Sequence, residues 1–436
     1  MNIKLNKRFM NTSVKKFLLF ILSFILFWFY IYRFKLVGFP ISTSQFLILL
    51  GSIFILIKIY NKKCIKFDYG IAIFIIGLIT PFFFIGLTSV INAQSDFSII
   101  TYFMSIPYSL LGFYCIKYYI KETHQKISFN DIAMLFIFTG VAQALLSLIA
   151  FFIPDIGNFL INIQAFGKEA GKELAENQFS RRLIGLGAMY FGGGIIYAID
   201  LVLITQLMLD KTLYKDKIYK FFPFFYLIIF ACGMMMARTT IVGLFFSILL
   251  LLKYSYKKIL HIVKTVLPAI LLLILMSSIL FFNYGDRAWK LYYFAFELFI
   301  NLSSGRGFQT GSSNATLRMI KFPDSNDYKS WLIGDALFST PDGHYYMYTD
   351  VGFCRSIFYF GIIGSLALLL TQSLMLLYVM KNLDKKYRYF LFILWLMFLT
   401  LNIKGFVLIH MYLIPFYFID KQDFLCSSNE GVLKNA

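Results

Sequence analysis

Charged residues are scarce in this chain of 436 residues: they make up 14% of the sequence, against 59% apolar residues. Soluble domains carry about 25% charged residues. This scarcity excludes an ordinary soluble domain. The apolar runs have about the length needed to cross a bilayer, and they predict an all-α, polytopic integral membrane protein.

Metal-binding and disulfide-forming residues are also few. The four histidines do not pair at metal-ligand spacing, and the five cysteines show no paired spacing. We therefore expect neither a protein-built zinc site nor a disulfide framework. A Walker or Rossmann fingerprint is missing as well. The sequence predicts no metal and no cofactor.

The net charge of +19 would by itself suit a nucleic-acid partner, but its distribution favours a membrane. With the N-terminus inside, the cytoplasmic segments hold 26 of the 41 lysines and arginines. This is the positive-inside pattern of a protein with twelve spans and both termini cytoplasmic. Basic residues then meet anionic lipid heads, and nucleic acid is not an expected partner. The predicted spans are residues 17–32, 41–60, 67–88, 97–119, 131–153, 183–209, 221–237, 239–252, 266–282, 351–380, 389–402 and 405–419.

The first span resembles a signal peptide, because five basic residues precede its apolar run. However, Arg33 and Lys35 follow where a cleavage site would need small residues. We therefore expect an uncleaved membrane helix.

The spans divide the chain into three predicted parts. Nine helices occupy residues 1–282, a large outer loop 283–350, and three more helices with a short cytoplasmic tail 351–436. In the loop, residues 286–300 have an aromatic-rich apolar face that predicts an interfacial helix. Residues 301–316 read as a flexible linker, and the turn residues at 323–327 precede Trp331. A smaller outer loop, 153–182, has charges at helical spacing over 168–176 that predict a solvated helix.

Arginine and lysine are sorted to opposite sides of the predicted topology. Twenty-four lysines fall inside and seven outside, whereas only Arg8 and Arg388 fall inside among the ten arginines. A guanidinium matches phosphate with a planar, bidentate fork. The sorting therefore predicts an anionic substrate at the outer face, with chance clustering as the alternative. The outer arginines are Arg33, Arg181, Arg182, Arg238, Arg287, Arg306, Arg318 and Arg355.

Arg238 is the sharpest local signal. The apolar run that follows it, 239–252, has 14 residues. At ~1.5 Å per residue this run covers ~21 Å, less than the ~30 Å hydrocarbon core. We therefore expect Arg238 to lie below the outer headgroups and to face a polar cavity. The alternative is an arginine that snorkels from a tight hairpin.

Four further features each have a structural and a functional interpretation. Asp200, inside the sixth span, either pairs with a basic residue or takes part in the mechanism. Glycines 192–194 either allow close helix packing or leave room for a lipid or a sugar. Asp350 is either the N-cap of the next helix or a site residue. His344 is either a surface residue or a proton acceptor.

Three short motifs follow one another in an order that points to a family. Ala237-Arg238-Thr239-Thr240 opens a span near mid-chain, the long outer loop ends in Asp350-Val351-Gly352-Phe353, and Asn402-Ile403-Lys404-Gly405 lies near the C-terminus. This arrangement resembles the Wzy-type oligosaccharide repeat-unit polymerases of O-antigen and capsule synthesis. It is more distantly similar to the O-antigen ligases.

The resemblance implies a GT-C-like polymerase/ligase architecture in the bacterial cytoplasmic (inner) membrane. It also implies a metal-independent, inverting glycosyl transfer in which undecaprenyl diphosphate leaves. The implied partners are an undecaprenyl-diphosphate-linked oligosaccharide, membrane lipids and a chain-length regulator protein.

Site residues follow from the resemblance and from the arginine sorting together. Arg238 matches the arginine of the mid-chain motif, Asp350 matches the acidic residue before the post-loop span, and either Arg181 or Arg182 precedes the glycine-rich span. Ligases place a histidine in the large loop, and His344 stands in a comparable place. The predicted catalytic residues are His344 and Asp350. The predicted diphosphate-binding residues are Arg181, Arg182, Arg238, Arg306, Arg318 and Arg355.

Three other functions stay open. A ligase would transfer glycan to a lipid core. A flippase would move the same lipid-linked oligosaccharide, although the chain shows no two halves of similar pattern and its long loop is placed asymmetrically. A structural membrane subunit would leave the arginine sorting unexplained.

Overall fold

The computed structural model describes residues 12–62, 69–124, 126–166, 182–187, 190–210, 213, 217–254, 256–307 and 309–419. Within these ranges the regular elements are helices, and the only strand-like pairings are three isolated bridges. The expected all-α class is confirmed. Arg181 and the predicted helix at 168–176 lie outside the described residues.

Seven described helical segments are long and apolar enough to cross a membrane. Many of their large apolar side chains are exposed on the surface of the bundle, as expected for a membrane-embedded protein. They comprise α1 (Thr12–Tyr32), α2 (Thr43–Lys62), α3 (Tyr69–Asn92), α6 (Phe129–Phe152), α9 (Tyr190–Met208), η2 with α10 (Lys217–Phe221 and Phe222–Met236) and α15 (Gly352–Asn382).

The other predicted spans coincide with further helices of the bundle. The segment 97–119 is divided into α4 (Ile100–Phe103) and α5 (Ser105–His124), with Pro107 in the first turn of α5, where proline is tolerated. The short span at 239–252 is α11 (Thr240–Leu252). The segment 266–282 lies within α12 (Tyr256–Ser303), and 389–402 corresponds to α16 (Lys385–Leu401).

The predicted span at 405–419 is helical over only part of its length. Its helix, α17 (His410–Tyr417), has eight residues and covers about 12 Å, less than the hydrocarbon core of a bilayer. The Asn402 side chain accepts from the N–H of Val407 at 3.1 Å and donates to its carbonyl oxygen at 3.0 Å. These bonds hold residues 402–407 in a closed turn instead of a helix. Similarly, the span predicted from residue 183 begins as helix only at Tyr190.

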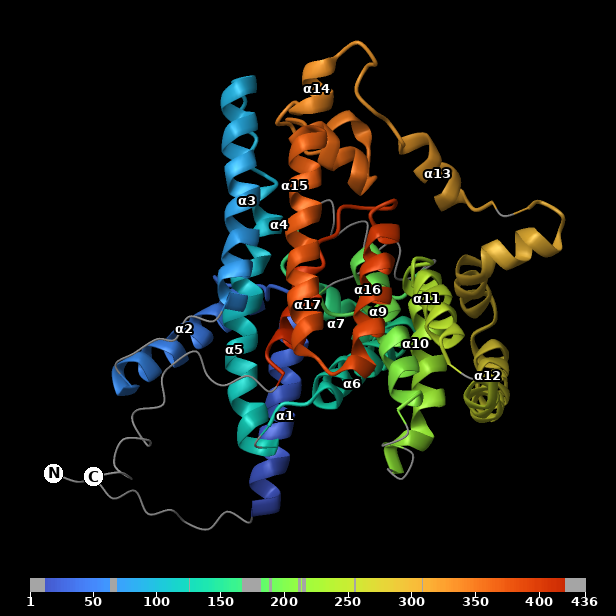
Figure 1. The fold of residues 1–436 in the computed structure, drawn as a ribbon. Helices are drawn as coiled ribbons and strands as arrows, with labels where there is room; N and C mark the ends of the chain where they lie inside the picture. The colour runs from blue at the N-terminus through green and yellow to red at the C-terminus, as the bar shows by residue number, and fades with distance from the viewer. Residues whose placement is uncertain are drawn as a thin grey trace, which may run out of the picture.

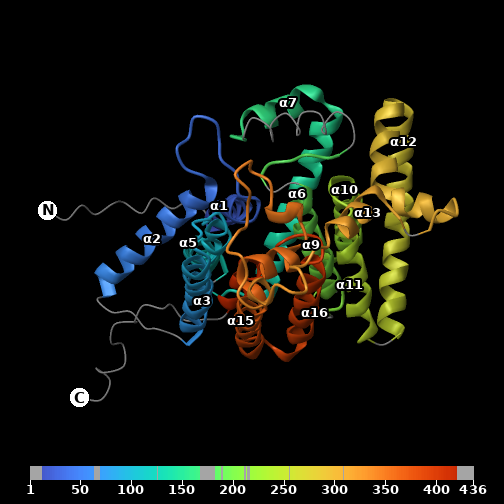
Figure 2. The ribbon, with the colours of Figure 1, turned by 90° about the horizontal axis from the view of Figure 1, so that it is seen from above.

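Helix α9 forms the centre of the bundle (Figures 1 and 2), and its residues 193–208 are all buried. It packs against α6, α10 and α11. A Cβ at Gly243 of α11 would stand 2.4 Å from the Cα of Ala198, and one at Gly194 would stand 2.9 Å from the Cβ of Ala237. Close helix packing is therefore one role of these small residues, as the sequence suggested.

The outer loop is more helical than predicted. Residues 286–300 are helical, as expected, and continue α12 beyond a break at Gly285. The predicted linker at 301–316 is wrong in its second part, because α13 (Gly311–Met319) begins there. The Thr310 side chain accepts from the N–H of Ser313 and the Ser313 side chain from that of Thr310, a capping box that starts the helix. After the predicted turn, Asp327 caps α14 (Tyr328–Leu332).

The last part of the loop is fixed on the bundle, with α14 beside the upper part of α15 (Figure 1). Helix α15 breaks at Gly361, which has a φ of 65°. The backbone of Gly334 packs against this break, and the N–H of Asp335 donates to the carbonyl oxygen of Phe358 at 2.6 Å. Asp96, from the turn after α3, accepts from the N–H groups of Phe338 and Ser339 at 2.7 and 2.8 Å.

Candidate functional site: a polar cavity at the loop end of the bundle

A cavity of about 510 Å³ opens where several helices end beside the outer loop. Its walls come from the end of α1, the starts of α4, α5, α9 and α15, and the irregular segment around 402–409. Four charged side chains line it: Arg33, Asp350, Arg355 and Lys404. Three cations face one carboxylate, so the cavity favours an anionic ligand.

Arg355 is the most unusual of these residues. It lies in the first turn of α15 and is 5% exposed. Its guanidinium carbon stands 3.7 Å from the ring centres of both Phe338 and Tyr345, which the outer loop supplies. The Nε and Nη2 atoms are buried and have no hydrogen-bond partner in the described part of the chain. Because unsatisfied donors of a buried charge are costly, the site is built to receive an acceptor.

Asp350 lines the same cavity, and its carboxylate makes no hydrogen bond or ion pair among the residues that the structure describes. The N-cap of α15 is Val351, and it has no side-chain capping bond. The N-cap interpretation of Asp350 is therefore wrong. Two successive residues just before it, Met347 and Tyr348, have positive φ angles of 55° and 53°. Such backbone strain is often retained where a loop must hold a functional group in place.

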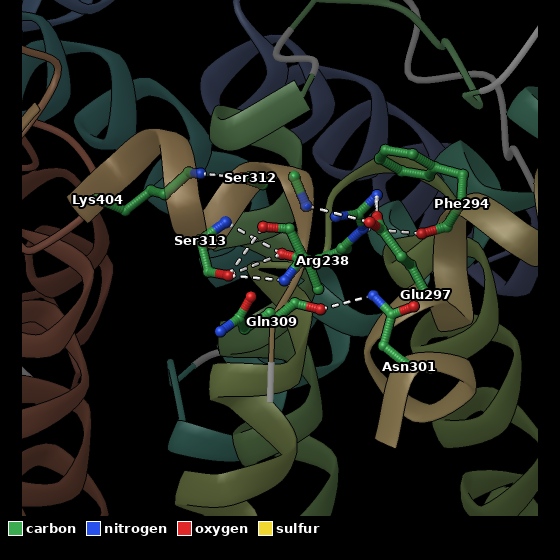
Figure 3. A network of polar contacts seen from close by, with 10 residues as sticks. Arg238, Phe294, Glu297, Asn301, Gln309, Ser312, Ser313 and Lys404 are labelled. Carbon is green, nitrogen blue, oxygen red and sulfur yellow. Dashed lines mark hydrogen bonds and ion pairs between the residues drawn. The ribbon is translucent and has the colours of Figure 1, made fainter. Parts of the chain in front are cut away.

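Lys404 connects the cavity to the outer loop. Its ammonium donates to the hydroxyl of Ser312, and to that of Thr316 at 3.2 Å, both on α13. Figure 3 shows this contact at the edge of a larger polar network. Neither hydroxyl carries a negative charge, so these two hydrogen bonds do not neutralise the lysine.

Arg238 lies on the far side of α13 in the same network (Figure 3). It forms an ion pair with Glu297 of α12 and donates from Nε to the carbonyl oxygen of Phe294 at 2.8 Å. Glu297 also accepts from the N–H of Gly311, the first residue of α13. Arg238 does not line this cavity, and Glu297, an acidic residue distant in sequence, compensates its charge. Its Nη1 atom is buried and has no hydrogen-bond partner among the described residues.

Arg182 and Arg238 share one aromatic ring. Their guanidinium carbons stand 4.6 and 4.5 Å from the centre of the Phe294 ring, and Arg182 also lies over Tyr190 at 5.2 Å. Cation–π attraction of about 0.5–2 kcal/mol each offsets part of the repulsion between the two arginines. They form a second cationic group beside the cavity.

The electrostatic influence of these groups on one another is visible in two pKa values. Burial lowers the pKa of Lys404; Asp350 opposes that change, and Arg238 and Arg182 add to it. Burial also lowers the pKa of Arg238; the charge of Glu297 raises it, and the charge of Arg182 lowers it further. The two groups of cations therefore repel each other, and an anion bound at either group would reduce this repulsion.

The remaining predicted site residues lie elsewhere. Arg306 and Arg318 are exposed on the outer loop, and neither lines the cavity. His344 is also exposed, with its ring 5.7 Å from that of Tyr348. The structure thus brings together Asp350 and Arg355 at the cavity and Arg182 and Arg238 beside it.

Sequence reasoning missed three parts of the site. Arg33 is one of the outer arginines, but the sequence does not indicate that it belongs to the site, although it lines the cavity. Lys404 stood in a motif, and its isolation on the outer side was the only available signal. The sequence around Glu297 gave no signal, because its role depends on the ion pair with Arg238, which only the fold brings close.

Asp200 is fully buried, and neither carboxylate oxygen has a hydrogen-bond partner in the described residues. The predicted pairing with a basic residue is therefore not seen there. A Cβ at Gly140 of α6 would stand 2.1 Å from its Oδ2, so the carboxyl group fills the space that this glycine leaves. Asp200 does not line the cavity. Across the described ranges, no cluster of three potential metal ligands is found.

No protein-family model, curated protein or solved structure matches this chain.

Proposed function

We propose that the protein is a membrane glycosyltransferase that polymerises undecaprenyl-diphosphate-linked oligosaccharide repeat units into O-antigen or capsular polysaccharide, as a Wzy-type polymerase would. One observation carries the proposal: a cavity at the loop end of a membrane bundle combines three cations with one unpartnered carboxylate. The diphosphate of a membrane-anchored lipid would bring negative charge to the membrane surface, where this cavity lies. The proposal places the protein in the bacterial inner membrane, with twelve membrane-inserted helices, both termini cytoplasmic and the loop outside.

The reaction joins two lipid-linked units. A sugar hydroxyl of one attacks the anomeric carbon of the other, a new C–O bond forms, and the C–O bond to the diphosphate breaks with its electrons leaving on the diphosphate. Arg355 and Lys404 stabilise this leaving charge more strongly than the charge of the ground state. Arg182 and Arg238 extend the positive field beside it.

The attacking hydroxyl must lose a proton, and positive charge develops on the anomeric carbon as its bond to the diphosphate breaks. A carboxylate beside the sugar can accept the proton or stabilise this positive charge. Asp350 lines the cavity and makes no competing contact within the described ranges, which supports it as that carboxylate. His344 does not line the cavity, so its position in this conformation supports no contact with the reacting atoms. This weakens the parallel with ligases.

The test is reconstitution of the purified protein in nanodiscs with lipid-diphosphate-linked repeat units and no other enzyme. Polymer ladders are the expected product. Transfer only to a lipid core would indicate a ligase, and movement of the lipid across a liposome bilayer without new bonds would indicate a flippase. Either result would overturn the polymerase proposal.

A further inference from the structure

Two side chains in the cavity wall, Ser105 and His410, form a pair that the reaction described above does not use. Ser105 begins α5 and lines the cavity, and His410 begins α17 directly behind it. The Oγ atom of Ser105 stands 2.6 Å from Nε2 of His410. The two residues are 305 positions apart in sequence, so only the fold brings them together.

The hydroxyl of Ser105 has two acceptors for its single proton. One is Nε2 of His410, and the other is the carbonyl oxygen of Tyr102, a short contact within the same chain segment. A hydroxyl group offers one donor and two lone pairs. When Ser105 donates to His410, its oxygen therefore remains able to accept from a hydroxyl group inside the cavity.

The surroundings of His410 keep the pair out of open solvent and close to a cation. The His410 side chain is 1% exposed, so its contact with Ser105 is shielded from bulk water. Arg33, which lines the same cavity, donates to the hydroxyl of Ser109, one helical turn after Ser105, at 3.0 Å. A diphosphate bound next to Arg33 would therefore lie on the cavity side of this pair.

We propose that Ser105 and His410 form a proton relay for the attacking sugar hydroxyl, an inference that rests on the proposed glycosyl transfer. As the new C–O bond forms, the hydroxyl proton moves to Oγ of Ser105 while the proton of Ser105 moves to Nε2 of His410. The electrons of the broken C–O bond leave on the diphosphate. Asp350 then faces the positive charge that develops at the anomeric carbon. The imidazolium finally returns its proton to the released diphosphate or to water.

Two variants test the relay in the nanodisc assay. His410→Gln keeps an amide beside Ser105 but cannot take up a proton, and Ser105→Ala removes the bridging hydroxyl. Each should lower kcat by about 10²–10⁴-fold, with KM changed by less than about threefold, because general-base catalysis contributes that much to the rate. The double variant should lose little more than either single one, since the two groups act as a unit.

The control is Ser373→Ala on α15, whose hydroxyl donates to the carbonyl oxygen of Leu369 away from the cavity. It should retain wild-type rates. The acidic limb of the kcat profile against pH should also change in His410→Gln, which a merely structural role would not cause.

Retention of kcat within about threefold in either folded variant overturns the relay alone. Should His410→Gln fail to insert, Ser105→Ala decides the question. A wild-type protein without any ladder would overturn the glycosyl transfer itself, and the two failures are thus distinguishable.

Discussion

At the scale of single residues, the two candidate arginines of the loop end differ in how their charge is compensated. Arg238 has Glu297 as its ion-pair partner. Arg355 lies against the faces of Phe338 and Tyr345 and has no ion-pair partner in the described part of the chain. A buried donor without a partner costs about 1–3 kcal/mol, which a bound phosphate oxygen would recover. Arg355 is therefore the better anion-binding group, although the sequence favoured Arg238.

The first prediction concerns the shape of that group. Arg355→Lys keeps the positive charge but lacks the planar fork and the stacking between two rings. We expect kcat/KM for ladder formation to fall by at least about tenfold, and Arg355→Ala to be worse. Initial rates in nanodiscs measure both. Full activity of the lysine variant would mean that charge alone is needed.

A second prediction separates catalysis from stability at Asp350. Because its carboxylate makes no hydrogen bond or ion pair in the described structure, Asp350→Asn should leave the Tm nearly unchanged, with an effect on unfolding within about 0.5 kcal/mol. The rate of ladder formation should nevertheless drop sharply. Thermal unfolding and rate measurements on the same preparation check this. A large loss of Tm would assign Asp350 a structural role.

At the scale of elements, α13 connects the two cationic groups. Its Ser312 and Thr316 accept from Lys404, while its first N–H donates to Glu297, the partner of Arg238. The helix itself has no buried residue. Its position therefore depends on these polar contacts along its first turns and on Met319 at its end, whose carbonyl oxygen accepts from the Thr349 hydroxyl. A ligand that competes for Lys404 or Arg238 would act directly on the first set.

Removing the carboxylate that compensates Arg238 tests this arrangement. Glu297→Gln should raise the affinity for inorganic pyrophosphate by about five- to tenfold, because a charge-assisted ion pair no longer competes for the guanidinium. Isothermal titration with wild-type protein as the reference measures the change. Unaltered affinity would show that Arg238 does not contribute to anion binding.

The attachment of the outer loop to α3 should depend on pH through Asp96. Burial would raise the pKa of this carboxyl group, but hydrogen bonds from Ser98, Ser339 and Phe338 outweigh it and hold the pKa below the ordinary value. The ionised form is thus favoured in the folded state. Its contribution is fully present above about pH 3.9, the unfolded value, and is lost as pH falls through the lowered folded value.

Asp96→Ala should mimic that loss at neutral pH and weaken the attachment by about 1–2 kcal/mol. Limited proteolysis of residues 335–350 at neutral pH would report it as faster cleavage, and pepsin digestion across the acidic range would follow the wild-type transition. Equal cleavage of wild type and variant at neutral pH would contradict the role of Asp96.

At the scale of the whole molecule, the charges of the two ends of the bundle have different roles. At the end opposite the cavity, Lys386 pairs with Asp210 at 2.9 Å, and Tyr387 contacts both Asp210 and Asn130, joining α6, α9 and α16. There the lysine is compensated. At the cavity end three cations share one carboxylate, and two donor atoms of Arg355 have no partner in the described residues.

Cysteine labelling would test the orientation of the chain. In a variant without native cysteines, Arg306→Cys and Arg318→Cys should react with a membrane-impermeant maleimide in intact spheroplasts. Lys381→Cys should react only after permeabilisation. The reverse pattern would place the cavity on the cytoplasmic side and remove the basis of the proposed reaction.

The lengths of the apolar runs correctly indicated the seven helical segments that are long and apolar enough to cross a membrane, because such runs reflect the lipid environment directly. They did not predict how short α17 is, because the Asn402 side chain closes a turn before it that no local sequence pattern indicates. The site was partly predictable, since Asp350 and Arg355 follow the loop in sequence. The compensation of Arg238 and the contact of Ser105 with His410 were not, because each depends on partners from distant segments.

The contact between Gly334 and Gly361 has a consequence for protein engineering. A Cβ at either position would stand within 2.5 Å of backbone atoms of the other segment, so loop and helix meet main chain to main chain. Exchanging residues 283–350 for those of another protein would therefore produce a working chimaera only if the donor sequence supplied the first glycine and the recipient kept the second.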